Sequence, residues 1–159
     1  MIEVKAPDAY HEHRAKPSAF LAGSIEMGVA EDWQAKIAQA LAAHDILILN
    51  PRRAAWDSSW EQSINNPFFR EQVEWELDAL DAADVVVMYF VPETKSPVTL
   101  LELGLHAAKN PEKIIVCCPN GFWRKGNVDI VCRRHGVQVE ENLDDLTAAL
   151  VARLSKKKG

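Results

Sequence analysis

The chain has 159 residues, of which 48% are hydrophobic, and this is enough for one domain with a buried core. The formal net charge of −5 argues against long nucleic acid as a partner, because such binding needs a basic surface that neutralises phosphates. The sequence has too few cysteines for a disulfide framework, and it has neither a signal-peptide core nor an apolar stretch as long as a membrane span. We therefore expect a cytoplasmic protein with no membrane partner.

The first segment, residues 1–17, is polar and contains two prolines, which predicts a flexible N-terminal arm. His11 and His13 lack a third ligand at helical or hairpin spacing, so no metal site is expected there. The remaining residues, 18–159, are predicted to form a single domain.

Strand-like and helix-like patterns alternate along residues 18–159. Short apolar runs predict strands over residues 19–22, 46–49, 85–90, 113–118 and 137–139. Apolar stripes predict helices over residues 33–41, 67–80, 99–109, 127–134 and 143–154. Such alternation indicates an α/β fold in three layers, with a doubly wound sheet of about five parallel strands.

Two of these elements carry more specific expectations. The run at residues 85–90 is apolar throughout, which is typical of a central strand buried on both faces of a parallel sheet. In the helix over residues 67–80, we expect one buried face, formed by Phe69, Val73, Leu77 and Leu80.

A carboxylate follows the predicted central strand at Glu102. In doubly wound sheets, ligands bind beyond the carboxyl ends of the strands, and we expect Glu102 in the first turn of the next helix. There the helix dipole would keep the carboxylate ionised and ready to act as a nucleophile. Thr99 and Glu102 also match a capping box, in which the glutamate only satisfies a backbone donor. The pattern leaves both interpretations open.

Glu76 is a second unusual carboxylate, because it lies beside Leu77 near the apolar edge of its helix. A salt bridge or a side chain that reaches solvent would explain it as well as a function would. If Glu76 and Glu102 met in one crevice, the pair would suit cleavage of a glycosidic bond.

Two further patterns concern ligand binding. Gly23 and Ser24 follow the first predicted strand and would let the backbone approach a sugar or phosphate, but the other glycines of a dinucleotide fingerprint are missing, so NAD is not expected. Trp56 and Trp60 lie in a long loop, where they would either stack on a base or pack the loop against the domain.

Several segments, taken in their order and spacing, resemble the nucleoside 2-deoxyribosyltransferase superfamily and especially its deoxyribosyltransferase-like branch. They are residues 20–25, 50–52, 75–76, 96–104 and 125–129. The resemblance implies a flavodoxin-like fold and a double displacement at the anomeric carbon, with no metal or organic cofactor. It also implies that the partners are a nucleoside or nucleotide and a free nucleobase.

The resemblance assigns roles to individual residues. Glu102 matches the nucleophilic glutamate, which forms a glycosyl-enzyme ester. Glu76 stands where the family has an aspartate that contacts the nucleobase and helps it to protonate. Gly23 and Ser24 fall in the first substrate loop. Asn127 matches an asparagine that reaches the active site of a neighbouring subunit, which implies a homo-oligomer with shared active sites.

Three more residues are expected to bind substrate. Asn50 ends the second predicted strand. Phe20 stands where many members have a tyrosine that orients the nucleophile. Ser96 stands where transferases usually have an aspartate that holds the sugar 5′-hydroxyl, whereas related nucleotide N-hydrolases have a serine that accommodates a 5′-phosphate.

The sequence thus predicts a nucleoside 2-deoxyribosyltransferase-type enzyme that transfers the sugar from one base to another. Ser96 favours an alternative, a hydrolase of nucleoside 5′-monophosphates, and predicts that a 5′-phosphate is tolerated. Phe20 and the altered acid at Glu76 favour another alternative, a nucleotide-binding module without turnover.

Overall fold

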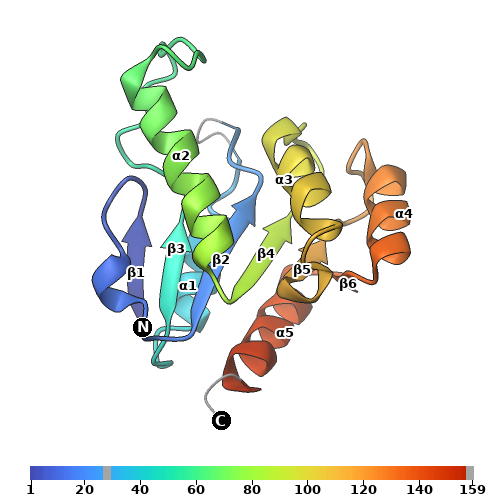
Figure 1. Cartoon of the computed structure of the whole chain (residues 1–159). Helices are drawn as coiled ribbons and strands as arrows, with labels where there is room; N and C mark the ends of the chain where they lie inside the picture. Colours follow the sequence, from blue (N-terminus) through green and yellow to red (C-terminus); the bar gives the residue numbers. More distant parts are fainter. Residues whose placement is uncertain (27–29, 157–159) are drawn as a thin grey trace.

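A computed structural model describes residues 1–26 and 30–156 of the chain. Its centre is a sheet of parallel strands in the order β1-β3-β2-β4-β5-β6 (Figure 1). The strands are β1 (Ile2–Lys5), β2 (Ser18–Gly23), β3 (Leu47–Asn50), β4 (Val85–Tyr89), β5 (Ile114–Cys117) and β6 (Gln138–Glu140).

Helices cover both faces of this sheet. They are α1 (Trp33–Ala40), α2 (Pro67–Ala82), α3 (Pro97–Ala107), α4 (Lys125–His135) and α5 (Leu143–Lys156), with short 3-10 turns η1 (His11–His13) and η3 (Pro111–Lys113). Figure 1 shows α2, α3 and α4 on one face, and α1 and α5 pack on the other. The three-layer α/β prediction is confirmed, with one strand more than expected. None of the described helices is both long enough and apolar enough to cross a membrane.

The strand order explains where a ligand would bind. Without β1, the order β3-β2-β4-β5-β6 is that of a flavodoxin-like sheet. The chain runs from β2 to β3 on one side and then returns to β4 on the other side. The carboxyl ends of β2 and β4 therefore flank a switch point, where the connections diverge and leave room for a ligand.

The N-terminal segment differs from the flexible arm that its composition suggested. Strand β1 forms the edge of the sheet, with Val4 opposite Leu49 of β3. Tyr10, which is only 2% exposed, then packs edge-on against Trp75 of α2 at 5.8 Å between ring centroids. An edge strand needs a partner on one side only, so the few apolar residues of this segment suffice to hold it.

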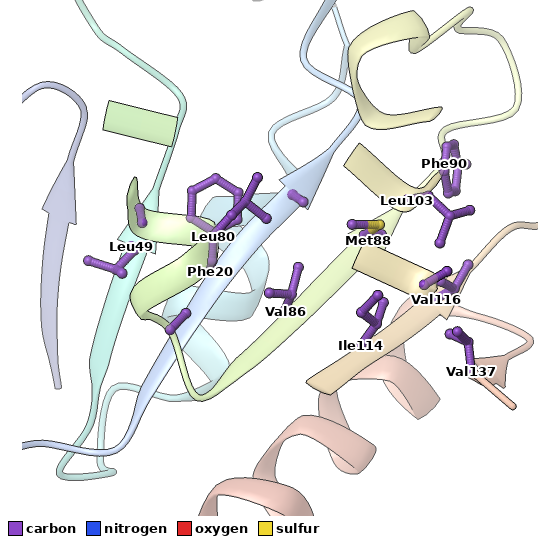
Figure 2. Close-up of a cluster of buried hydrophobic side chains, with 14 of the residues drawn as sticks. Phe20, Leu49, Leu80, Val86, Met88, Phe90, Leu103, Ile114, Val116 and Val137 are labelled. Carbon is purple, nitrogen blue, oxygen red and sulfur yellow. The ribbon is translucent and has the colours of Figure 1, made fainter. Parts of the chain in front are cut away.

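Successive residues of the strands pack on opposite faces of the sheet and so belong to two separate hydrophobic cores. In β2, Phe20 packs toward α2 and α3, whereas Ala19 and Leu21 pack toward α1 and α5. Figure 2 shows the first core, in which Phe20 lies close to Leu80 of α2 and Met88 and Leu103 lie farther along the sheet.

Helix α2 is turned differently from the sequence-based prediction. Its N-cap is Asn66, and Pro67 occupies the first helical position. Leu77, predicted to be buried, is 43% exposed. Leu80 is buried as predicted, and the other buried residues are Gln72, Trp75 and Ala79. The large Trp75 ring determines which face meets the sheet, and this rotation also turns Glu76 inward.

Candidate functional site

A cavity of about 610 Å³ lies between α2 and α3 at the carboxyl end of β2. Its volume is in the range of sites for small molecules. Another cavity, of about 510 Å³, lies at the opposite end of the strands beside Ser18 and Leu47. The cavity between α2 and α3 is the one at the switch point, and we call it the crevice.

Five of the residues predicted to catalyse or to bind substrate line the crevice: Phe20 and Gly23 from β2, Glu76 from α2, Ser96 just before α3, and Glu102 from α3. The fold therefore brings the two carboxylates into one cavity, which the sequence alone did not establish.

Glu102 lies deeper in its helix than predicted. Helix α3 begins at Pro97 with Ser96 as its N-cap, so Glu102 is the sixth helical residue and belongs to the second turn. Thr99 is inside the helix, which means that the capping box is wrong and Glu102 does not satisfy an end of the helix. The side chain is 7% exposed, and within the described residues no donor bonds its carboxylate.

The pKa of Glu102 moves in the direction opposite to our expectation. Burial, and to a lesser extent the nearby charge of Glu76, raises it to about 8. The expected dipole effect fades within the first helical turn, whereas the loss of hydration acts on a carboxyl group wherever it is buried. Glu102 is thus a buried acid with no cation to neutralise it in the described part of the chain.

Glu76 is held by an amide. Gln72 Nε2 donates hydrogen bonds both to Glu76 Oε1 at 2.8 Å and to the carbonyl oxygen of Pro51 at 2.9 Å. Burial raises the pKa of Glu76 to about 7, and the bond from Gln72 opposes this shift. No cation pairs with Glu76 among the residues that the structure describes, so the salt-bridge interpretation has no support. Gln72 is a site residue that sequence reasoning missed.

Gly23 is required where β2 meets β4. Its φ is +144°, and an added Cβ would lie 2.4 Å from the carbonyl oxygen of Tyr89. The next residue, Ser24, donates its N–H to the same oxygen at 2.9 Å. The glycine therefore lets the end of β2 lie tightly against β4 and directs the following loop over the crevice.

Three hydroxyl groups form a buried cluster behind this turn. The side-chain oxygens of Ser24, Thr94 and Ser96 lie 2.6 to 2.8 Å from one another. Val91 N–H donates to Ser24 Oγ, and Thr94 Oγ1 donates to Val91 O, both at 2.8 Å. Each hydroxyl proton therefore has an acceptor inside the protein. Ser24 supports the site from this cluster and does not line the crevice.

Glu26 reaches from the loop after β2 to the start of α3. Its Oε1 accepts the backbone N–H groups of Lys95 at 2.9 Å and of Ser96 at 2.7 Å. Both Glu26 and Ser96 have a φ of +47°, which is uncommon for residues with side chains. Glu26 lines the crevice. The sequence gives no signal for it, because a lone glutamate in a polar loop resembles any surface residue.

The two tryptophans have different positions. Trp56 lines the crevice, whereas Trp60 lies behind it at 5.2 Å between ring centroids. Trp60 in turn stacks on Phe68 and lies under the guanidinium of Arg53. Trp60 thus packs the long loop against α2, and Trp56 presents an aromatic wall to a ligand.

Besides Ser24, two predicted substrate-binding residues, Asn50 and Asn127, are absent from the crevice lining in the described part of the chain. Asn50 Nδ2 donates to Glu3 Oε1 at 2.7 Å, and Asn50 Oδ1 accepts the N–H of Arg52 at 2.9 Å, so this amide shapes the turn that leads into the crevice. Asn127 is exposed on α4.

Comparison with models of known protein families identifies a match. The model of the nucleoside 2-deoxyribosyltransferase-like family matches residues 16–122, which is more than half of the chain. The matched range contains Glu26, Glu76 and Glu102 and ends before Asn127. No curated protein matches the chain.

Proposed function

The chain belongs to the nucleoside 2-deoxyribosyltransferase-like family, and from this membership we propose that it cleaves the N-glycosidic bond of deoxynucleosides and transfers the sugar to another base. The observation that carries the proposal is the pair of carboxyl groups, Glu76 and Glu102, which line one nucleoside-sized crevice.

The protonation of the pair suits this reaction. With pKa values of about 7 for Glu76 and about 8 for Glu102, the two groups together hold about one proton between pH 7 and pH 8, and in the free protein that proton lies mainly on Glu102. A nucleobase nitrogen next to Glu76 would accept a hydrogen bond from the protonated carboxyl group. Binding of the base therefore stabilises the protonated form of Glu76. Glu102 is then ionised and can act as the nucleophile.

In the first half of the reaction, a Glu102 carboxylate oxygen attacks C1′ of the sugar. The C1′–N bond breaks, its electron pair goes to the base nitrogen, and the proton of Glu76 neutralises the departing base. The products are a free base and a glycosyl ester on Glu102.

In the second half, a nitrogen of an incoming base attacks C1′ of the ester. The C1′–O bond breaks, Glu102 leaves as a carboxylate, and the proton lost by the incoming nitrogen returns to Glu76. If water enters instead, the same ester yields free 2-deoxyribose, so transfer depends on a site that keeps water out.

The base would lie against the wall formed by Trp56, Phe69 and Val73, which all line the crevice. In the described part of the chain, Trp56 Nε1 and Gln72 Oε1 are buried without a hydrogen-bond partner. Buried polar atoms normally have partners, so both atoms would gain from a small shift of these side chains that lets a base with donors and acceptors reach them.

A second copy of the chain would complete the site. On α3, Val98, Leu101 and Leu105 form an apolar stripe that is 52 to 63% exposed, and Ile130 of α4 is 68% exposed. Such a stripe is unusual on a monomer surface. Because Val98 also lines the crevice, a subunit that packed on the stripe would come close to its opening, where Asn127 of the neighbour could reach the substrate.

The test is to incubate the protein with deoxyinosine and an excess of adenine, and to separate the products by chromatography. We expect deoxyadenosine, with little free 2-deoxyribose. Free sugar that adenine does not diminish would overturn the transferase in favour of the hydrolase. Absence of base release from any deoxynucleoside would overturn the enzyme and leave a binding module.

A further inference from the structure

Glu26 brings a negative charge to the start of α3. Its carboxylate accepts two backbone N–H groups there, from Lys95 and Ser96, and both bonds are accepted by Oε1. Backbone donors at the start of a helix are the usual binding place for a phosphate or another anion. In this protein the carboxylate of Glu26 accepts these two N–H groups in place of an external anion.

The sugar of a bound nucleoside would extend toward the part of the crevice that Glu26 and Ser96 line, which we call the corner. Trp56 and Phe69 line the crevice and offer aromatic surfaces on which a base would stack, and Glu102 lines the same crevice. Ser96 is six residues before Glu102, which places the two about 9 Å apart along the helix axis. With C1′ at Glu102 and the base on the aromatic wall, the 5′ substituent lies on the side of Glu26 and Ser96.

The groups at this corner fit a hydroxyl better than a phosphate. A carboxylate accepts a hydrogen bond from a sugar hydroxyl but repels a phosphate dianion. The hydroxyl of Ser96 is already hydrogen-bonded to Ser24 and Thr94. The guanidinium of Arg52, which also lines the crevice, is bound to the carbonyl oxygen of Ala30 at 2.8 Å.

From this arrangement we infer that Glu26 is a specificity residue, which selects deoxynucleosides with a free 5′-hydroxyl and excludes 5′-monophosphates. The inference rests on the proposed function. It differs from what Ser96 alone predicted, because that residue without Glu26 would leave a neutral, donor-rich corner suited to a phosphate.

The experiment compares base release from deoxyinosine and from deoxyinosine 5′-monophosphate, measured as kcat/KM, in the wild type and in Glu26→Gln. Glutamine keeps the accepting oxygen for the two N–H groups and removes only the charge. The control is Glu93→Gln, which neutralises an exposed carboxylate in the loop before α3 that is outside the crevice lining.

We expect the wild type to prefer the free nucleoside, Glu26→Gln to shift the ratio of the two kcat/KM values toward the monophosphate by about tenfold or more, and Glu93→Gln to leave it unchanged. The role of Glu26 would be overturned if the wild type preferred the monophosphate, or if the ratio of the two kcat/KM values in Glu26→Gln equalled that of the wild type. Either result would leave the proposed cleavage of the glycosidic bond standing.

If the wild type cleaves neither compound, the proposed function fails, and the same pair of ligands is compared by calorimetric binding. A shift in binding selectivity toward the monophosphate in Glu26→Gln would then support the inference, whereas equal selectivity in the two proteins would overturn it.

Discussion

Glu76 on α2 and Glu102 on α3 line the same crevice, where burial and then the negative charge of Glu76 raise the pKa of Glu102. Neither has a cation beside it in the described part of the chain. Two buried carboxyl groups that resist simultaneous ionisation must share a proton, and this is the arrangement by which one of them can serve as acid and the other as nucleophile.

Replacing Glu102 with glutamine should lower base release by about a thousandfold or more, because an amide oxygen is a poor nucleophile. The fold should remain intact, since glutamine has the same shape. Glu74→Gln on the exposed side of α2 is the matched control and should retain full activity. Near-wild-type turnover of Glu102→Gln would reduce Glu102 to a packing residue.

The pH profile of kcat/KM should be bell-shaped. Activity rises with pH as Glu102 ionises and falls as Glu76 loses its proton, so the maximum lies between the apparent pKa values of about 7 and about 8 that the pair displays.

The variant Glu76→Gln separates the two limbs of this profile. It should remove the alkaline limb, because position 76 then has no proton to lose, and leave a single acidic limb that reports the ionisation of Glu102 without the charge of Glu76. An unchanged bell in this variant would show that other groups control the rate.

The free energy of unfolding should also depend on pH because of the buried carboxyl group of Glu102. The pKa of Glu102 in the folded protein is raised from 4.5 to about 8, so the folded state binds this proton more tightly than the unfolded state. The resulting stability is complete below about pH 4.5 and is lost as the pH rises toward 8 and beyond.

Thermal unfolding of the wild type and Glu102→Gln at pH 6 and pH 9 measures this effect. The variant should lose less stability over this interval by about 2 kcal/mol, or about 4 to 8 °C in Tm for a chain of this size. Parallel losses in the two proteins would mean that Glu102 ionises freely in the folded state.

The sequence predicted those features of the fold that repeat along the chain. Apolar runs identified β2 to β6, and the continuous run of β4 correctly placed the centre of the sheet. The orientation of α2 was wrong because Leu77 fitted the apolar period, whereas the size of Trp75 determines the buried face. Such competition between side chains is decided by packing, which periodicity does not describe.

Less of the site than of the fold could be predicted from the sequence. Glu102 and Glu76 could be named, but their meeting in one crevice depends on how α2 and α3 sit on the sheet. Gln72, Thr94 and Glu26 were missed, since each is an ordinary polar residue in sequence and gains its role only from contacts between distant segments.

Shared active sites can be tested by mixing two inactive variants. If Asn127 serves the neighbouring subunit of a dimer, Asn127→Ala and Glu102→Gln should each be nearly inactive alone. Their mixed dimer has one intact site, so random exchange of subunits should restore about a quarter of wild-type activity. Failure to regain activity after exchange, or a fully active monomer, would contradict sharing.

The most direct measurement is a search for the glycosyl ester on Glu102. The protein is mixed with excess deoxyinosine, quenched in acid within the first turnover, and analysed by mass spectrometry of the intact chain and of its peptides. A covalent mechanism predicts an added mass of one 2-deoxyribosyl group on the peptide that contains Glu102, which free adenine removes as deoxyadenosine when it is added before the quench. Release of hypoxanthine with no adduct on any peptide would contradict it, because the bond would then break without a covalent intermediate.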